Sequence, residues 1–410
     1  MYERHIEERV WAALKDTPVV FVNGARQTGK TTLVKRIAGA LPESTYQTFD
    51  DAAVLASAAH DPAGFIRSFS GTAIIDEVQK VPALFPAIKA EVDQNRKPGR
   101  FLLTGSADIL LLPRISESLA GRMEIVTLWP LSQGELAGSR ESFIDKLFGS
   151  GRFRSSRILP EKSPLIRRIL LGGFPEVLTR KDEQRRRAWY GSYLSTILQR
   201  DVRDLSHIEG LTDMPRLLSL LAARIGGLHN AAEISRAAGL AHNTLKRYLT
   251  LLETTFLIKR LSPWHANLGK RLVKSPKLYL SDSGLASYLN GLEREDSLNA
   301  SQLKGPLCEN FVFSELLKQS SWSNMPLSLW YFRTAVGKEI DFILEDSRGR
   351  LSGIEVKASA TIGPEDFSAL KEWAGDVKSR FMCGIVLYWG DNALPFGNGF
   401  WALPLQLLWQ

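Results

Sequence analysis

The chain has 410 residues, of which 44% are hydrophobic and 23% are charged, a composition typical of an ordinary soluble protein. This length predicts two to four domains. The two cysteines exclude a disulfide framework and a cysteine-based zinc site, and no apolar run is long enough to cross a bilayer, so we expect a cytoplasmic protein without a membrane partner.

Positive charge is concentrated in the middle of the chain. Residues 137–290 contain 26 Lys or Arg and 13 Asp or Glu, a surplus of 13. The whole chain has a net charge of +8, which leaves −5 for the remainder. A clustered positive surplus is typical of proteins that bind nucleic acid, although a solvated basic face gives the same pattern.

The first segment alternates short apolar runs with helix-compatible stretches, which predicts a parallel sheet covered by helices. Within it, "NGARQTGKTT" at 23–32 directly follows the apolar run "PVVFV" and fits the spacing of a phosphate loop. In such a loop, backbone amides and a helix N-terminus hold phosphates, Lys30 bridges the β and γ phosphates, and Thr31 is a Mg²⁺ ligand. The predicted nucleotide-binding residues are Gly24, Ala25, Arg26, Gln27, Thr28, Gly29, Lys30, Thr31 and Thr32.

The acidic half of the predicted ATP site lies in "TAIIDEVQK". Asp76 would hold magnesium through water, and Glu77 would polarise the attacking water. The next apolar run, "RFLLTGSAD", ends in Thr104 and Ser106. Either hydroxyl is a candidate sensor of the γ-phosphate or of the water, and strand-end capping is the alternative.

Together, "GARQTGKTTL", "IIDEVQKVP", "LLTGS" and "SLAGR" resemble the AAA+ superfamily. They are most similar to the prokaryotic ATPases whose core precedes a C-terminal domain of unknown function with a restriction-endonuclease-like fold. "GGFPEVL" and "LQRDVRDL" resemble the helical lid of that family. The resemblance covers essentially the whole chain and implies an α/β protein that hydrolyses ATP to ADP and phosphate.

The same resemblance implies a homo-oligomer, with a hexameric ring as one form. In such a ring Arg122 would reach into the neighbouring subunit's site, and a surface ion pair is the alternative. The predicted parts are an AAA+ P-loop ATPase core at 1–136, a linker and helical lid at 137–215, a winged helix-turn-helix at 216–292, and a restriction-endonuclease-like domain at 298–410. We expect the glycine-rich text between 137 and 165 to be an exposed loop.

A helix-turn-helix is predicted by "NAAEISRAAGLAHNTLKRYLTLLE". Its first helix would end at Gly239, Asn243 would cap the second, and Leu245, Tyr248 and Leu249 would share one face. The second helix of such a motif enters the major groove of DNA, and a basic loop follows here as a wing. The predicted DNA-binding residues are Asn243, Thr244, Lys246, Arg247, Lys270 and Arg271. The alternative is a module that contacts protein.

The C-terminal segment predicts a carboxylate site. Glu355 and Lys357 in "GIEVKAS" share one strand face, and Asp341 in "EIDFIL" lies on the neighbouring strand. Asp341 and Glu355 would share a divalent metal while Lys357 orients water, which is the chemistry of phosphodiester hydrolysis. The order of elements resembles the PD-(D/E)XK nuclease fold, which implies Glu309 as a fourth residue. A metal-free ion cluster is the alternative.

The leading hypothesis is an ATPase, with ATP and Mg²⁺ as cofactors, that moves or remodels bound DNA through its lid and winged helix. An ATP-gated, metal-dependent DNA nuclease is one alternative. An ATP-dependent signalling switch whose winged helix binds a protein is the other.

Overall fold

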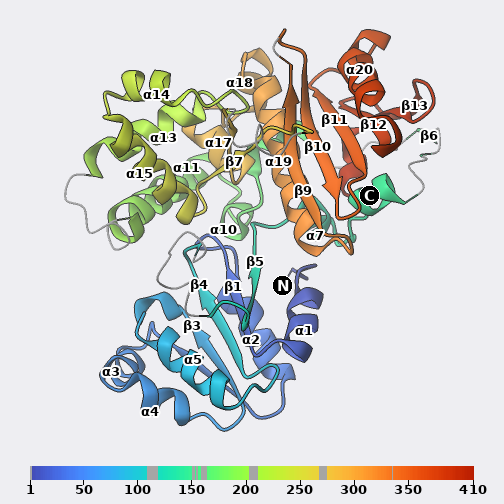
Figure 1. The fold of residues 1–410 in the computed structure, drawn as a ribbon. Helices are drawn as coiled ribbons and strands as arrows, with labels where there is room; N and C mark the ends of the chain where they lie inside the picture. Colours follow the sequence, from blue (N-terminus) through green and yellow to red (C-terminus); the bar gives the residue numbers. More distant parts are fainter. Residues whose placement is uncertain are drawn as a thin grey trace. The chain divides into compact units, whose positions relative to one another are not determined.

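The computed structural model describes residues 2–108, 119–149, 153, 156–157, 164–202, 211–266, 275–334 and 336–410 (Figure 1). The chain divides into two compact units, which are described separately below. The first comprises Met1–Leu131 and Thr250–Leu257, and the second comprises Ser132–Leu249 and Ile258–Gln410. Within the described ranges, no helix is both long and apolar enough to cross a membrane.

Parallel strands in the order β2-β3-β4-β1-β5 form the sheet of the first unit, as far as it is described (Figure 1). The strands are β1 (Val19–Asn23), β2 (Ser44–Thr48), β3 (Thr72–Asp76), β4 (Phe101–Gly105) and β5 (Met123–Thr127). The helices are α1 (Glu7–Asp16), α2 (Lys30–Ala40), α3 (Ala52–His60), α4 (Pro62–Arg67), α5 (Leu84–Gln94) and the 3₁₀ turn η1 (Val78–Lys80). Strand β4 lies between β1 and β3. Because the three strands are parallel, their carboxyl ends lie side by side at one edge of the sheet.

Both faces of this sheet are covered, which explains why its central strands are almost entirely apolar. Phe21 and Ile75 point into a core shared with α3, α4 and α5. Their chain neighbours Val20 and Ile74 are equally buried and face the opposite side, because successive strand residues alternate. Helix α1 packs against β1 and β5, and α2 packs against β2, β3 and β4.

The second unit begins with a region of helices and one hairpin. Its helices are α7 (Gln133–Ala137), α8 (Phe143–Phe148), α9 (Leu165–Leu171), α10 (Pro175–Leu178), α11 (Glu183–Thr196) with the π-helical turn η3 (Ile197–Asp201), η4 (Leu211–Asp213), α13 (Met214–Ala222), α14 (Ala231–Ala238), α15 (His242–Thr254), α17 (Ser283–Leu289) and α18 (Glu295–Ala300). The end of α15, from Thr250, belongs to the first unit. Strands β7 (Ile258–Leu261) and β8 (Lys277–Leu280) pair in antiparallel fashion. Helices α14 and α15 and then this strand pair follow one another in the segment predicted to be a winged helix-turn-helix, and that assignment stays a prediction.

The C-terminal part of the second unit is a mixed sheet. Among described residues its strand order is β6-β13-β14-β12-β11-β10-β9 (Figure 1). The strands are β6 (Ser156–Arg157), β9 (Leu327–Arg333), β10 (Glu339–Asp346), β11 (Leu351–Lys357), β12 (Phe381–Tyr388), β13 (Asn392–Pro395) and β14 (Phe400–Pro404). The helical elements are α19 (Lys304–Trp322), α20 (Ser368–Val377), η5 (Pro364–Phe367), η6 (Lys378–Arg380) and η7 (Leu405–Leu408). Leu370 and Trp373 of α20 pack on Ile343 of β10.

The expectation of an exposed loop between 137 and 165 is wrong for part of that segment. Phe143 and Leu147 are buried on helix α8. Strand β6 pairs with β13 at the edge of the C-terminal sheet. The glycines and charges of this segment dominate its composition, but helix α8 packs against strand β12 and helix α19.

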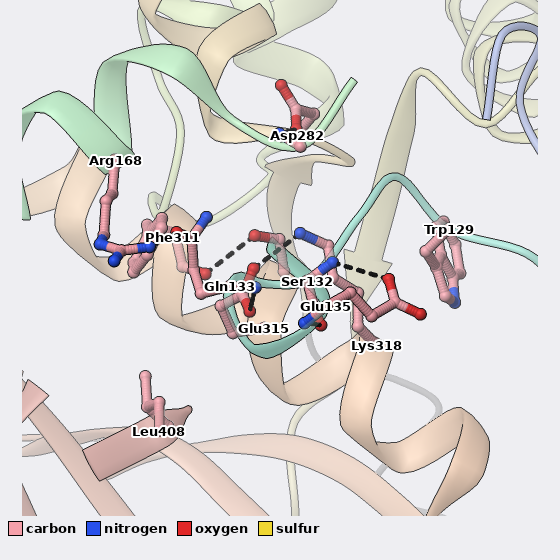
Figure 2. A network of polar contacts seen from close by, with 12 residues as sticks. Trp129, Ser132, Gln133, Glu135, Arg168, Asp282, Phe311, Glu315, Lys318 and Leu408 are labelled. Atoms are coloured by element: carbon pink, nitrogen blue, oxygen red, sulfur yellow. Dashed lines mark hydrogen bonds and ion pairs between the residues drawn. The ribbon is translucent and has the colours of Figure 1, made fainter. Parts of the chain in front are cut away.

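A buried polar network joins helix α7 to the long helix α19 (Figure 2). The carboxylate of Glu315 accepts hydrogen bonds from the backbone N–H of Gln133, at 2.9 Å, and from the Lys318 ammonium, at 2.7 Å. Arg168 of α9 donates to the Gln133 side chain at 2.7 Å. Because buried charges are tolerated only when paired, this network fixes the start of the second unit to α19.

Candidate functional site

The predicted phosphate loop connects β1 to α2. Gly24 has φ 146°, and a Cβ atom there would lie 2.2 Å from the carbonyl oxygen of Leu128, so only glycine fits. Gly29 also has a positive φ of 97° and directly precedes the first residue of α2. The loop therefore ends at a helix N-terminus, where unpaired N–H groups attract anions.

The loop's lysine is buried. The Lys30 ammonium donates to the carbonyl oxygens of Gly24 and Ala25, both at 2.9 Å. Thr28 is buried and its hydroxyl also donates to the Ala25 carbonyl, at 2.9 Å. Outside the loop, Arg4 donates to the Thr28 carbonyl at 2.7 Å and so braces the turn.

The remaining predicted loop residues have different positions. Gln27 is exposed with a left-handed φ of 64°, Arg26 is half-buried, and Thr32 is exposed on α2. A left-handed conformation in a residue other than glycine is uncommon and shows that the turn is tightly defined.

Asp76 is the centre of the site, because it joins the phosphate loop to the neighbouring strands. The Thr31 hydroxyl donates to Asp76 Oδ2 at 2.8 Å. Tyr46 on β2 donates to the same oxygen at 2.8 Å, and Thr104 on β4 donates to Oδ1. Burial, reinforced by Asp76, raises the pKa of Tyr46, so its hydroxyl remains a donor.

Glu77 adopts a strained backbone. Its φ of 61° and ψ of 42° are left-handed, a conformation that costs a non-glycine residue about 1–3 kcal/mol and is concentrated at functional sites. Its N–H donates to the Thr104 hydroxyl at 3.0 Å. Its carboxylate accepts from Gln79 and, at 3.4 Å, from Ser106, and Gln79 also donates to Ser106 at 3.0 Å. Both hydroxyls predicted as sensors therefore touch the acidic pair.

Arg122 lies on the turn before β5. Its Nε atom is 2.5 Å from Asp93 Oδ1 in an ion pair at the surface. A hydrogen bond from Arg122 is the main cause that lowers the pKa of Asp93. Within one chain, Arg122 forms a surface ion pair with Asp93. A role for Arg122 in a neighbouring subunit's site stays a prediction.

Helix α15, the second helix of the predicted helix-turn-helix, has the expected apolar face. Leu245, Tyr248 and Leu249 are buried, and helix α14 ends at Gly239 with φ 70°. Helix α15 begins at His242, so Asn243 is its second residue and not its cap, contrary to the expectation.

The predicted DNA-contacting side chains of α15 lie on its outer side. Asn243, Lys246 and Arg247 are exposed and Thr244 is half-buried. The predicted wing residues Lys270 and Arg271 lie outside the described residues. DNA binding by this helix stays a prediction.

The C-terminal carboxylates lie on the predicted elements. Glu309 is on α19, Asp341 on β10, and Glu355 and Lys357 on β11, where the Lys357 ammonium is 3.2 Å from Glu355 Oε1. Burial first, and the neighbouring Asp341 next, raise the pKa of Glu309 to about 7 and that of Glu355 to about 8. Within the described ranges, no three or more His, Cys, Asp or Glu side chains are arranged to hold a metal.

A buried lysine lies among these carboxylates. Lys277 of β8 is 1% exposed, and its ammonium is 2.8 Å from Glu309 Oε1 and 3.4 Å from Asp341 Oδ1. It also pairs with Glu339 of β10. We call Lys277 with Glu309, Glu339 and Asp341 the lysine-centred cluster. Asp341, which the sequence predicts to share a metal with Glu355, faces this ammonium, and the shared metal stays a prediction.

Sequence reasoning missed residues around Asp76 and in the lysine-centred cluster. Tyr46 and Gln79 carried no signal beyond lying near the ends of strands. Lys277 did have a signal in the sequence. It lies two residues before Tyr279 in the strand-like text "PKLYL", so the two side chains share one face of a strand, and in a buried strand that face points inward. Glu339 precedes Asp341 by two residues and shares its strand face for the same reason.

Comparisons with known proteins agree with part of this picture. Residues 16–137 match an AAA domain family, residues 163–296 match a domain of unknown function (DUF8612), and residues 304–408 match another domain of unknown function (DUF4143). Uncharacterized proteins of Mycobacterium tuberculosis and Mycobacterium bovis are each 32% identical over 403 residues, which is 98% of this chain and 83% of the relative. An uncharacterized protein of Haemophilus influenzae is 27% identical over 66% of this chain and 62% of the relative.

Among solved structures, AMPPCP-bound DnaA from Aquifex aeolicus is similar with a TM-score of 0.30 and 15% identity, over 60% of this chain and 86% of that chain. A similarity of this size is too weak to support an argument about function.

Proposed function

We propose that this chain, which belongs to the family of AAA-domain proteins that includes its two mycobacterial relatives, hydrolyses ATP at the site formed by Lys30, Asp76 and Glu77. The observation that carries the proposal is the 2.8 Å contact between Thr31 and Asp76. It unites two motifs that are 45 residues apart, at the edge where β1, β3 and β4 end.

The phosphate loop supplies the binding half of the site. The triphosphate would accept hydrogen bonds from the loop's backbone N–H groups and from the start of α2. Lys30 would exchange its contacts with the Gly24 and Ala25 carbonyls for phosphate oxygens. A charged oxygen is the stronger acceptor for an ammonium, so this exchange favours the bound state.

The chain's oxygen donors fit a magnesium ion. Thr31 and Asp76 would hold it, since a hydroxyl and a carboxylate are the hard ligands that Mg²⁺ prefers. When bound, Mg²⁺ neutralises charge on the phosphate oxygens. The glycine-only cradle at Gly24 and the buried, unpaired side-chain oxygen of Asn23 beside the loop are consistent with a polar ligand here.

Glu77 would act as the general base. Its strained backbone and its hydrogen bonds from Gln79 and Ser106 hold the carboxylate in one orientation beside Asp76. Thr104 links the two acidic residues, because it donates to Asp76 and accepts from the Glu77 N–H. A positioned base of this kind contributes a rate factor of about 10² to 10⁴.

The test is phosphate release from ATP by the purified full chain. Lys30→Ala should lower turnover at least about 100-fold, as removal of a donor to developing charge does in other enzymes. Lys15→Ala, a change at an exposed lysine of α1, is the matched control and should leave turnover unchanged. Turnover in Lys30→Ala equal to that of the control would overturn the proposal.

We further propose that ATP turnover moves or remodels bound DNA through the helix-turn-helix. The exposed Lys246 and Arg247 on α15 and the positive surplus of 13 in residues 137–290 support this part. Each lost phosphate contact should reduce the slope of log affinity against log salt by about 0.9. The slope of log affinity for DNA against log salt is measured for the double variant Lys246→Ala/Arg247→Ala and compared with that of Arg185→Ala on α11. If DNA does not change the ATPase rate and the chain shows no salt-sensitive binding to DNA, the protein-binding switch is favoured instead.

A further inference from the structure

The lysine-centred cluster is built from parts of the chain that are far apart in sequence. Lys277 comes from the hairpin strand β8, Glu309 from helix α19, and Glu339 and Asp341 from strand β10. Lys277 is 32 residues from Glu309 and 64 from Asp341. A cation buried to this degree is stable only when carboxylates compensate its lost hydration, so the cluster is a specific feature of the fold.

The carboxylate oxygens in this cluster are already used by the protein. Asp341 Oδ1 faces the Lys277 ammonium at 3.4 Å, and Oδ2 accepts from the Val356 N–H at 2.8 Å. Glu309 Oε1 accepts both from Lys277, at 2.8 Å, and from the Tyr279 hydroxyl, at 2.5 Å. Three oxygens that a divalent ion would need at about 2.0–2.6 Å, Asp341 Oδ1, Asp341 Oδ2 and Glu309 Oε1, are therefore bonded to other donors, whereas the buried Oε2 of Glu355 has no hydrogen-bond partner among the described residues.

The ammonium is held in place by the backbone that carries it. Lys277 pairs with Leu261 in the β7–β8 ladder, and the carbonyl of the preceding Pro276 accepts from the His229 N–H at 2.7 Å. The ring of Tyr331 lies 5.8 Å from the ammonium. The hairpin thus fixes the Cα atom from which the ammonium reaches the carboxylates, and a dication beside the ammonium would be repelled by its charge.

We propose that the ε-ammonium of Lys277 is the resident cation of the C-terminal carboxylates, so that this domain works with an internal lysine where a metal-dependent nuclease has a divalent ion. The residues present therefore do not fit the metal that the PD-(D/E)XK resemblance implies. Two consequences follow. The domain does not hydrolyse phosphodiesters, and the buried charge of Lys277 adds to the backbone and aromatic contacts that join the β7–β8 hairpin to the C-terminal sheet.

The first test measures Mn²⁺ binding to the nucleotide-free full chain by electron paramagnetic resonance. The wild-type protein and Asp341→Asn should bind the same number of Mn²⁺ ions. A bound ion that Asp341→Asn loses and Asp76→Asn retains would overturn the proposal. Because this comparison starts from the wild-type protein, it holds even if changes at Lys277 impair folding. It is also independent of whether ATP is hydrolysed.

The second test removes the lysine. Lys277→Met removes the cation that Glu309, Glu339 and Asp341 share and leaves Glu339 its surface pair with Arg333, so the variant should gain one Mn²⁺ ion and its melting temperature should rise on addition of Mn²⁺. Lys318→Met, which removes a buried lysine from Glu315, is the matched control and should gain none. A folded Lys277→Met that binds no additional Mn²⁺ contradicts the proposal.

A cleavage assay completes the design. Labelled single-stranded and duplex DNA should remain intact with the wild-type protein, ATP and either Mg²⁺ or Mn²⁺. Cleavage by the wild-type protein that Asp341→Asn abolishes would overturn the proposal and restore the nuclease alternative, while leaving the ATPase proposal untouched.

Discussion

Asp76 and Asp341 are both buried aspartates on sheet strands, but the groups that satisfy them differ in charge. Among the described residues, the side chains that bond to Asp76 are the hydroxyls of Thr31, Tyr46 and Thr104. Asp341 instead faces the Lys277 ammonium and a backbone N–H. Neutral donors orient a carboxylate and leave its charge available to a cation, whereas an ammonium neutralises it.

The two proposals together mean that carboxylate spacing alone does not define a metal site. Both regions were predicted from acidic residues at the ends of apolar strands. What separates them is the residue that supplies the counter-charge, and in the C-terminal domain that residue comes from a distant hairpin. The comparison can be tested from both sides, by removing charge from the Asp76 region and by removing the cation from the Asp341 region.

The largest expected effect is at Glu77. Glu77→Gln keeps the shape of the side chain but removes the base, so turnover should fall by about 10² to 10⁴ while ATP still binds. Phosphate release and binding of a fluorescent ATP analogue measure the two properties separately. Glu91→Gln on α5 is the control for loss of a carboxylate elsewhere in the same unit. Turnover within twofold of the wild type in Glu77→Gln would show that another group activates the water.

The next effect is on stability. Lys277→Met without added metal should lower the free energy of unfolding of the second unit by about 3–5 kcal/mol, because it leaves buried carboxylates uncompensated. Chemical denaturation measures the change. Lys338→Met is the matched control, since its pair with Glu372 is about half-exposed on both sides and should be worth at most about 1 kcal/mol. An equal loss of unfolding free energy in the two variants would mean that the buried cation contributes no more to stability than the exposed one.

A smaller effect is expected at Tyr46. Tyr46→Phe removes one of the hydroxyls that orient Asp76, a hydrogen bond to a charged group worth about 1.5–3 kcal/mol, and leaves Thr31 and Thr104 in place. Turnover should fall by about tenfold and ATP binding should weaken less. Tyr2→Phe, at an exposed tyrosine of the same unit, is the control. Unchanged turnover would show that the two threonines suffice.

Most residues of the proposed nucleotide site could be named from the sequence because they are local. Gly24 to Thr31 form one turn, and Asp76 and Glu77 follow one apolar strand, so spacing alone indicates their chemistry. Tyr46 and Gln79 were not predicted, because their contribution depends on which strands are neighbours in the sheet. The order β2-β3-β4-β1-β5 brings Tyr46 to Asp76, and no local pattern states that order.

The C-terminal region shows the limit of the same reasoning. The strands and helices around Asp341 and Glu355 were placed correctly, since hydrophobic alternation depends on neighbouring residues. Whether the carboxylates bind a metal or pair with a lysine depended on Lys277, which precedes Glu309 by 32 residues. In the sequence this lysine was counted with the positive surplus assigned to DNA binding. A charge count cannot distinguish a lysine that faces solvent from one buried in an ion cluster.

The smallest expected effect is a pH dependence of stability. Burial, followed by Asp341, raises the pKa of Glu355 from its ordinary value of 4.5 to about 8, while Lys357 and Lys277 act in the opposite direction. A carboxyl with a raised pKa binds its proton more tightly in the folded state, so its contribution to stability is complete below pH 4.5 and is lost as the pH rises through about 8.

The melting temperature of the wild-type protein should therefore fall more steeply between about pH 5 and pH 8.5 than that of Glu355→Gln, which carries no titrating group at this position. Glu372→Gln, at a half-exposed surface glutamate, should keep the wild-type slope. A slope that is the same in all three proteins would mean that Glu355 is ionised throughout. The ammonium of Lys357 would then be the counter-charge of Glu355, as that of Lys277 is for Asp341, whereas the side chains bonded to Asp76 are neutral hydroxyls.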